Sequence, residues 1–545
     1  MEFAPLEFNS RRSPVMGRGG IVSTSQSLAT AAGLEILSRG GNAADAAVAA
    51  AAALNVTEPT STGIGGDMFA LFFDAQSRSV SALNGSGRAP AALTLDRLAK
   101  EGLLDDGLPP FHAHTVTVPG ACAGWLDLLE RHGTLGPGEV LAPAIRLAEE
   151  GFPVAPLTSI FWRSAANRQL ATAPNGAEMT VAGRGPEPGE IFRNPGLART
   201  FHTVVEGGKK AYYEGPIARA IAQVIQGAGG CVTEDDLAAH TSTWETPASV
   251  TYRGYRVYEC PPNGQGITAL IALNVLEGFD FSSLELLSPE ALHLQIEALR
   301  LAFADARWYI SDPEFTQIPL DQLLSKDYAA ERRKLLDPRA ATLDPARGLP
   351  VTSSDTVYLS VVDKLGNACS FTNSNYMGFG TGIVPKGWGF TLQNRGHNFS
   401  LDRGHPNALA PRKRPYHTII PALATRESDG SLFASFGVMG GFMQPQGHVQ
   451  VFSALVDGGL DPQSALDLPR FCIDSSDGTG TVSLEQGIPD RTMERLAEMG
   501  HPVRLVAGIG RSLFGRGQVI LRDPRTGTLT AGSDPRADGC AMTLI

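Results

Sequence analysis

An abrupt change of character near residue 355 constrains this chain more than any other feature. Residues 336–355 are rich in Pro, Asp and Ser and show no periodicity, which indicates a linker or an exposed loop. The sequence TVYLSVVD follows at once, with the alternation and the β-branched residues of a strand. The middle third of the chain, before this break, has mostly helical patterns, whereas strands and helices alternate beyond it. The pattern predicts a structural boundary just before Thr356.

Thr356 is the first residue of the predicted strand. If the chain cut itself after Asp355, Thr356 would become a new N-terminus that carries a hydroxyl nucleophile and an α-amine base on one residue. An exposed polar segment is also where a cut would be accessible. Thr is common in strands for ordinary reasons of propensity, however. The spacing alone leaves both interpretations open.

Composition and charge exclude several classes of protein. The 545 residues carry a formal net charge of −11 without a block of Lys or Arg, so we expect no nucleic-acid partner. The longest apolar run, residues 46–56, is too short to span a membrane, and the N-terminus lacks the apolar core of a signal peptide. We therefore expect a cytoplasmic protein with no membrane partner. Export in a processed form stays open if the natural start differs from the one given.

No cofactor or metal motif is complete. The six cysteines form no CxxC pair, which predicts reduced thiols and no cysteine zinc site. His293 and Glu297 lie one turn apart on a predicted helix, but without a nearby third ligand a pair on one helix face is the better interpretation than a metal site. GxSxG, P-loop, HExxH and complete GxGxxG motifs do not occur. We expect no cofactor and no metal, and the nucleophile candidates that remain are Ser, Thr and Cys.

Over nearly its whole length the chain resembles the γ-glutamyltransferases (glutathione hydrolases) and their amidohydrolase relatives. The segments that carry the resemblance include GGNAADAAVAAAAALNVTEP, GIGGDMFALF, VPGACAGW, CPPNGQG, TVYLSVVDKLGNACSFTNS, KRPYHTIIPAL, GVMGGFMQPQGH and SDPRADG. The resemblance implies an N-terminal-nucleophile hydrolase of α/β (α+β) class with an αββα four-layer sandwich. A mostly helical large (α) subunit, 1–355, and a small (β) subunit, 356–545, would arise by self-cleavage between Asp355 and Thr356. They would form one composite domain as a heterodimer, with a higher oligomer left open.

The same resemblance implies the catalytic groups. The family's nucleophile falls on Thr356, and its oxyanion-binding pair of glycines falls on Gly440 and Gly441, for which an ordinary turn is the alternative. Ser374 falls on a second hydroxyl that would orient the amine of the nucleophile, and an ordinary strand serine is an equal alternative. The substrate's acyl group would pass through an ester with the Thr356 hydroxyl.

The substrate side departs from the family pattern. Arg88 falls on the arginine that clamps an α-carboxylate, with a structural surface arginine as the alternative. Asn398 stands where the family has an acid for the glutamyl ammonium, and Arg395 stands where transferases carry a neutral or acidic residue. Tyr376 replaces an asparagine of the glutamyl pocket. The family's pair of serines becomes His417–Thr418.

These changes predict a different substrate from a γ-glutamyl compound. Two arginines without a matching acid favour a carboxylate-bearing acyl group, so we expect an amidohydrolase for a small oxamate-like or glutaryl-type amide. Relatives that hydrolyse oxamate or act on β-lactam side chains are similar in this respect. A true γ-glutamyltransferase or glutathione hydrolase is the first alternative. A catalytically silent binding protein with the same fold is the second.

Overall fold

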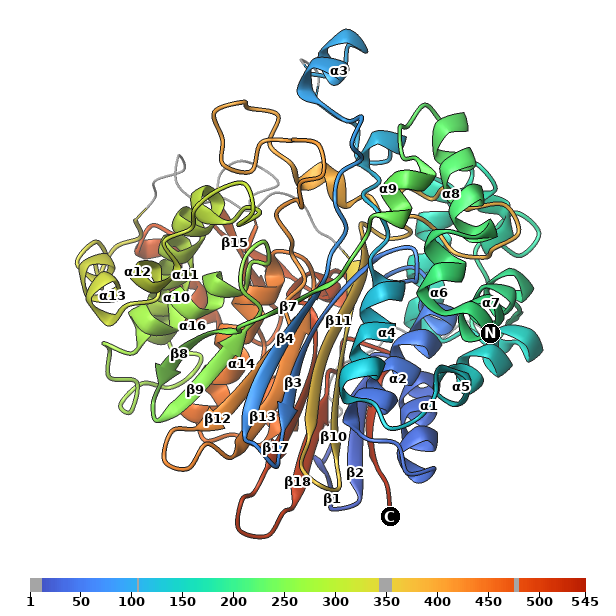
Figure 1. Cartoon of the computed structure of the whole chain (residues 1–545). Coiled ribbons are helices and arrows are strands. Elements are labelled where there is room, and N and C mark those ends of the chain that lie inside the picture. The colour runs from blue at the N-terminus through green and yellow to red at the C-terminus, as the bar shows by residue number, and fades with distance from the viewer. Residues whose placement is uncertain (1–11, 105–106, 343–354, 475–479) are drawn as a thin grey trace.

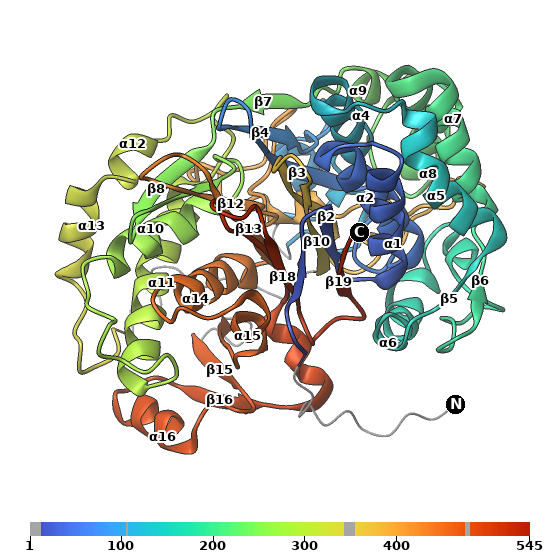
Figure 2. The ribbon, with the colours of Figure 1, turned by 90° about the horizontal axis from the view of Figure 1, so that it is seen from below.

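The protein is built as four layers, with two antiparallel sheets stacked face to face between two layers of helices (Figure 1). The computed structural model describes residues 12–104, 107–342, 355–474 and 480–545. The expected αββα sandwich is confirmed. Figure 2 shows the helix layers on opposite sides of the paired sheets from a second direction.

Within the described residues, each of the two large sheets has seven strands. In spatial order, the first sheet consists of β1 (Val15–Gly17), β18 (Leu529–Ser533), β17 (Arg516–Arg522), β13 (Leu432–Met439), β12 (Ala422–Arg426), β9 (Tyr255–Glu259) and β8 (Ala248–Tyr252). The second consists of β19 (Cys540–Thr543), β2 (Gly20–Thr24), β10 (Asp355–Asp363), β11 (Ala368–Tyr376), β3 (Asp67–Asp74), β4 (Ser79–Gly85) and β7 (Thr243–Glu245). Smaller sheets join β14 (Phe471–Asp474), β15 (Thr481–Glu485) and β16 (Val503–Val506), and β5 (Phe152–Pro153) and β6 (Ile191–Phe192).

Different helices cover the two sheets. The second sheet is covered by α1 (Ser27–Ser38), α2 (Ala43–Thr57) and α4 (Ala121–His132), and further out lie α5 (Pro137–Glu150), α6 (Pro156–Ala165), α7 (Pro195–Tyr213), α8 (Pro216–Gly227) and α9 (Glu234–Ala238). The first sheet is covered by α10 (Gly266–Leu276), α14 (Met443–Val456) and α15 (Pro462–Asp467), with α11 (Pro289–Tyr309), α12 (Leu320–Leu323), α13 (Lys326–Arg333) and α16 (Asp490–Glu498) outside them. The short helix α3 (Leu95–Lys100) stands apart at the top of Figure 1.

Helix α2 is the most deeply buried helix of the layer on the second sheet, and every one of its residues is buried. Its start is fixed by a capping box, in which the Asn42 side chain accepts from the amide of Asp45 and the Asp45 carboxylate accepts from the amide of Asn42. Alanine is the best helix former, and its small side chain lets α1 and α5 approach closely. The small side chains of this Ala-rich segment predict a helix inside the protein, and the structure confirms it.

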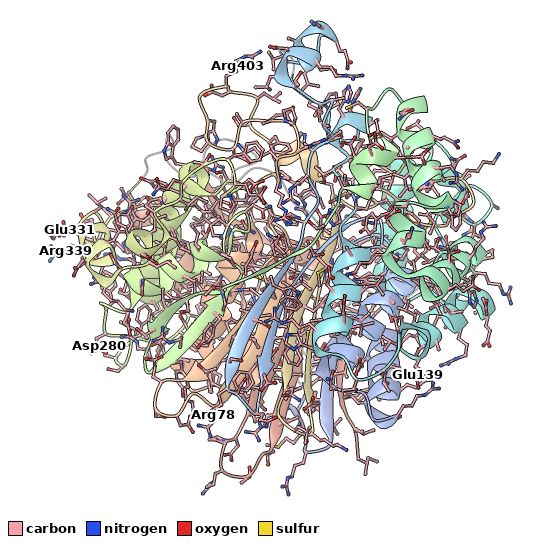
Figure 3. All side chains as sticks on the ribbon, in the orientation of Figure 1. Arg78, Glu139, Asp280, Glu331, Arg339 and Arg403 are labelled. Atoms are coloured by element: carbon pink, nitrogen blue, oxygen red, sulfur yellow. The ribbon has the colours of Figure 1, made fainter. Side chains whose placement is uncertain are left out.

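The two sheets pack against each other along β10 and β13. The Ser360 hydroxyl donates to the Ser435 hydroxyl across the sheets at 2.5 Å. Apolar side chains such as Phe69, Leu423 and Ile520 fill the space on either side. Both sheets take strands from before and after residue 355, so neither segment could form its layer alone. Charged side chains such as those labelled in Figure 3 lie at the rim, away from this core.

One predicted strand is absent. The sequence of residues 389–394 (GFTLQN) predicts a strand, but these residues join no ladder. Gly389 has a φ of +66°, and the backbone bonds go to separate loops: the amide of Gln393 donates to the carbonyl of Gly65, and the amide of Thr381 donates to the carbonyl of Leu392. The apolar pattern of this segment reflects the burial of its side chains and not hydrogen-bonded pairing with another strand.

None of the helices in the described part of the chain is both long and apolar enough to cross a membrane.

We predict that Ala50→Leu in α2 lowers the free energy of unfolding by about 1–3 kcal/mol, because the added methylenes have no space in the packed layer. Ala50 is fully buried. Ala31→Leu on the exposed face of α1 is the matched control and should change stability by less than about 0.5 kcal/mol. Denaturant titration of both variants measures the difference. Equal stabilities would show that α2 is more loosely packed than described.

Candidate active site

Thr356 lies in the middle of the second sheet, at the start of β10. Strand β10 pairs with β2 on one side and with β11 on the other. The register with β11 shifts between Asp355 and Val357, so a β-bulge with its extra residue on β11 lies opposite Thr356. Bulges are frequent next to active sites, where they redirect a side chain. Thr356 is fully buried in the uncut chain.

The Thr356 hydroxyl is held from the second sheet and from helix α14. It donates to the Ser374 Oγ at 3.2 Å and accepts from the Gln444 Nε2 at 3.4 Å. Ser374 belongs to β11, and its Oγ also accepts from the amide of Tyr376 at 2.9 Å. Gln444 belongs to α14, and the amide of Ile420 donates to its Oε1 at 2.9 Å. The predicted pair of Thr356 and Ser374 is thus brought together.

Gly440 and Gly441 form the turn between β13 and α14. Their φ values are +134° and +60°, which side chains rarely adopt, so glycine is required here. The carbonyl of Gly441 accepts from the Gln265 Nε2 at 2.8 Å. The amides of both glycines donate no hydrogen bond to any described residue. Because Gln444 follows three residues later and contacts Thr356, two unused N–H donors lie in the neighbourhood of the hydroxyl.

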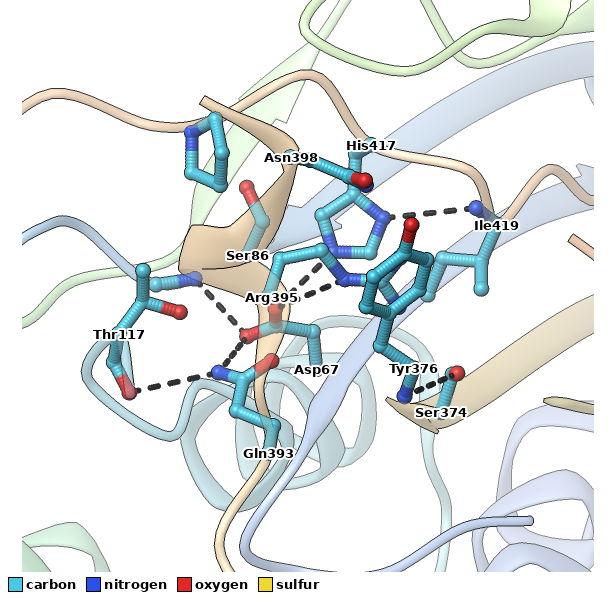
Figure 4. A network of polar contacts seen from close by, with 12 residues as sticks. Asp67, Ser86, Thr117, Ser374, Tyr376, Gln393, Arg395, Asn398, His417 and Ile419 are labelled. Carbon is cyan, nitrogen blue, oxygen red and sulfur yellow. Dashed lines mark hydrogen bonds and ion pairs between the residues drawn. The ribbon is translucent and has the colours of Figure 1, made fainter. Parts of the chain in front are cut away.

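A buried carboxylate, Asp67, organises the predicted substrate residues (Figure 4). Its Oδ1 accepts from the amide of Gly87 at 2.9 Å and from the Gln393 Nε2 at 3.0 Å. Its Oδ2 accepts from the His417 Nε2 at 2.9 Å and lies 4.0 Å from the Arg395 Nε. Asp67, His417 and Arg395 are all fully buried, so the network is shielded from water.

The pKa values define the charges in this network. Burial, with the nearby Arg395, lowers the pKa of His417 to about 4, so the ring is neutral at neutral pH. It donates its Nε2–H to Asp67, and its Nδ1 accepts from the amide of Ile419. Burial works to raise the pKa of Asp67, but the His417 hydrogen bond and Arg395 outweigh it and hold that pKa below its ordinary value. Burial lowers the pKa of Arg395 to about 10, which leaves it charged.

Arg395 also contacts the other predicted residues. Its Nη1 donates to the Thr418 Oγ1 at 2.7 Å, and its guanidinium lies 4.4 Å from the centre of the Tyr376 ring. Tyr376 has a φ of +79°, an uncommon conformation for a residue with a bulky side chain. The structure therefore brings Arg395, Tyr376, His417 and Thr418 together beside Ser374.

Arg88 is placed differently. Its Nη2 forms an ion pair with the Glu314 Oε1 at 2.9 Å. The expectation of two arginines without a matching acid is wrong for the folded chain, because Asp67 faces Arg395 and Glu314 faces Arg88. The partner acids are far from both arginines in sequence, so the local motifs did not show them. As a substrate-binding residue, Arg88 stays a prediction.

A cavity of about 390 Å³ adjoins this network. It is lined by Arg307, Tyr376, His397, Asn398, Phe399, Ser400, His405, Asn407, Tyr416 and Phe442. These lining residues include no acid. The Asn398 Nδ2 donates to the carbonyl of Tyr416 at 3.1 Å, which places the predicted Asn398 in the cavity wall beside Tyr376.

A second buried cluster contains His293 and Glu297, the pair considered as metal ligands from the sequence. His293 and Glu297 do meet a third group, His501, which the sequence did not reveal. The ring nitrogens of His293 and His501 are hydrogen-bonded to each other at 2.7 Å, and the Arg300 Nη1 lies 3.4 Å from the Glu297 carboxylate. The Glu297 Oε2 also accepts from the amide of Thr342. These contacts favour a hydrogen-bonded core cluster, because a cation would compete with Arg300.

Comparison with known proteins decides the family. The family model described as Gamma-glutamyltranspeptidase matches residues 29–544. The chain belongs to this family. It is therefore an enzyme of the amide hydrolase and acyltransferase type.

Relatives of this family member carry several activities in their names. It is 39% identical to the "Glutathione hydrolase-like YwrD proenzyme" of Bacillus subtilis (strain 168), over 97% of this chain and 99% of the relative. It is 33% identical to the "Oxamate amidohydrolase proenzyme" of Klebsiella pneumoniae, over 96% and 98%. The crystal structure of cephalosporin acylase from Bacillus halodurans is 44% identical, has a TM-score of 0.93 and covers 100% of both chains.

Three residues of this site were missed by sequence reasoning. Asp67 begins an otherwise apolar strand, and an acid in a strand buried on both faces is itself a signal. Gln444 lies within the segment GVMGGFMQPQGH, but nothing in that pattern indicates a contact with Thr356. Arg307 lies near the end of α11, and only the folded chain shows that it lines the cavity.

We predict that the buried His417 makes this family member less stable as the pH falls. The ring takes up a proton near pH 6.5 in the unfolded chain but only near pH 4 in the folded chain. The contribution of the neutral ring to the free energy of unfolding is therefore complete above pH 6.5 and is lost as the pH falls from 6.5 to 4. His417→Gln should reduce this loss by up to about 3 kcal/mol. Thermal unfolding from pH 7 to pH 4 measures it. His202→Gln, at an exposed site, is the control, and an unchanged pH profile for His417→Gln would contradict the prediction.

Proposed function

We propose that this protein is a self-processing N-terminal-threonine amidohydrolase that cleaves a small carboxylate-bearing amide through an acyl-enzyme on Thr356. The observation that carries the proposal is the position of the Thr356 hydroxyl. It lies opposite a β-bulge, between Ser374 and Gln444, next to the turn with the two unused amides. Thr356 is also the first residue after the predicted cut.

Self-processing needs no group from outside the chain except water. The Thr356 Oγ1 attacks the carbonyl carbon of Asp355, the peptide C–N bond breaks, and the hydroxyl proton ends on the Thr356 nitrogen. The product is an ester, and water opens it to the Asp355 carboxylate and the restored hydroxyl. Ser374 accepts the Thr356 hydroxyl hydrogen bond, which orients the oxygen lone pairs for attack.

The cut creates the catalytic base. The new α-amine of Thr356 has a reference pKa of about 7.7–8.0, which suits proton transfer near neutral pH. It takes the hydroxyl proton as Oγ1 attacks the substrate amide and gives it to the departing amine. The amides of Gly440 and Gly441 stabilise the oxyanion, and removing one such donor typically costs about 3–4 kcal/mol. Water or an acceptor amine then releases the acyl group.

The charges around the cavity support a carboxylate-bearing acyl group. A γ-glutamyl group would bring an ammonium, which needs a carboxylate, and the described lining has none. Asp67 is already used by His417 and Arg395. Relatives named for oxamate and for cephalosporin agree with this choice. The alternative, a γ-glutamyltransferase or glutathione hydrolase, is favoured by the relative named glutathione hydrolase-like.

We predict that the purified chain separates into two fragments on a denaturing gel and that the smaller one begins at Thr356. Thr356→Ala should stay intact, because it lacks the attacking oxygen, whereas Thr356→Ser should still be cut. N-terminal sequencing of the small fragment is the measurement. A small fragment that begins elsewhere would contradict the assignment of Thr356 as the nucleophile. A wild-type chain that never separates would support the silent binding protein.

A second prediction concerns the substrate. The mature enzyme should hydrolyse glutaryl-p-nitroanilide or oxamate with a higher kcat/KM than γ-glutamyl-p-nitroanilide, since an uncompensated ammonium in this cavity costs binding. Release of p-nitroaniline or of ammonia measures the rates, with Thr356→Ala as the blank. A clear preference for the γ-glutamyl compound would instead identify a glutathione hydrolase.

A further inference from the structure

Arg307 is the only guanidinium that lines the described cavity wall, and it differs from the two arginines that the sequence singled out. Arg395 has Asp67 and Thr418, and Arg88 has Glu314. Among the described residues, the Arg307 guanidinium has neither a hydrogen bond nor an ion pair. It is half-buried near the C-terminal end of α11.

The acids near this end of α11 are engaged elsewhere. Asp305 pairs with the Arg332 Nη2 at 3.0 Å. The Asp312 carboxylate accepts from the amides of Arg414 and Glu314 at 2.8 and 3.0 Å. Burial lowers the pKa of Arg307, so its environment opposes the charge without supplying a partner. A half-buried cation of this kind gains most from an anionic ligand.

The cavity connects this cation with the site of the reaction. Tyr376 and Phe442 line the same cavity. The amide of Tyr376 donates to the Ser374 hydroxyl that holds Thr356, and Phe442 directly follows Gly441. The Tyr416 hydroxyl, in the wall beside Arg307, donates to the Gln265 Oε1 at 3.0 Å. An acyl group bound at Thr356 would therefore extend into the space that Arg307 faces.

The loop 400–412 contributes lining residues to the same cavity and packs against the residue next to the arginine. The amide of Ser400 donates to the carbonyl of Asn407 at 3.0 Å, which closes the loop on itself. The His405 ring lies 5.5 Å from the ring of Trp308, the residue after Arg307. Ser400, His405 and Asn407 supply neutral polar groups to the cavity and add no competing negative charge.

We propose that Arg307 binds the carboxylate at the far end of the substrate's acyl group and so selects short dicarboxylic acyl amides such as glutaryl amides. This rests on the function proposed above and names the residue that gives it its substrate class. A guanidinium can hold a carboxylate through two parallel hydrogen bonds. The volume of about 390 Å³ is that of a small-molecule pocket.

The test compares acyl groups that differ only in the carboxylate. Glutaryl-p-nitroanilide and valeryl-p-nitroanilide are matched in chain length, and valeryl-3-carboxy-4-nitroanilide moves the carboxylate to the leaving group. Arg307→Gln should lower the ratio of kcat/KM for glutaryl over valeryl roughly tenfold to hundredfold, mainly through KM, since a hydrogen bond to a charged group is lost. The ratio for Arg307→Lys should lie between those of wild type and Arg307→Gln, because lysine keeps the positive charge but cannot form two parallel hydrogen bonds with a carboxylate.

Arg403→Gln is the control for net charge. Arg403 lies on the same loop at the upper edge of the molecule in Figure 3, is not among the residues that line the cavity, and pairs with Asp96 at the surface. It should leave the ratio unchanged. The same ratio in Arg307→Gln and wild type would overturn the proposal. If Arg307→Gln lowers kcat/KM only for valeryl-3-carboxy-4-nitroanilide, the proposal is also overturned. Arg307 would then bind a carboxylate of the leaving group and not one of the acyl group.

Binding separates this proposal from the proposed function. Titration calorimetry with glutarate on the purified protein should give weaker binding for Arg307→Gln than for wild type, with valeramide as the neutral probe. If no amide is hydrolysed but glutarate binding depends on Arg307, the function fails and the anion site stands. If hydrolysis occurs but glutarate binds equally to both proteins, the anion site fails. Equal thermal midpoints exclude a folding defect as the cause.

Discussion

A carboxylate can be buried without water only when other groups compensate its charge, and this requirement shapes the site around Asp67. Four groups contact it or lie beside it: an amide at residue 87, the side chain of Gln393, the ring of His417 and the guanidinium of Arg395. They come from segments up to 350 residues apart. The carboxylate thus fixes, in one place, the loop that follows β4 and the two irregular segments that lead to the cavity.

The same requirement divides the arginines into two kinds. Arg395 is fully buried and charged because Asp67 is present, and it packs on the Tyr376 ring. It thus links Asp67, Thr418 and the Tyr376 ring at the cavity wall. Arg307 has no such partner among the described residues, and it lines the cavity. Residue type alone would make the two equivalent, but their surroundings assign one to the framework and leave the other for a ligand.

The sequence was most informative where chemistry depends on local pattern. The capping box at Asn42, the start of a strand at Thr356 and the glycine pair before α14 all follow from neighbours in the chain. It was least informative where contacts span hundreds of residues. The stacking of the layers decides which acids lie opposite Arg395 and Arg88. It also decides which residue completes the His293 cluster and where Arg307 lies. Residues 389–394 show a related limit, since an apolar run indicates burial but does not say whether a pairing strand is available.

The sharing of both sheets between the two segments has a consequence for a chain cut at Thr356. Strand β10 would keep its ladder from Val357 onward, between β2 from one fragment and β11 from its own. The fragments would therefore be interlocked layer by layer, and neither could leave without taking both sheets apart. Subunit exchange between molecules should be negligible under native conditions. Recovery from heat would require two separate chains to meet and fold together, so the lifetime of the folded enzyme would be set by its rate of unfolding.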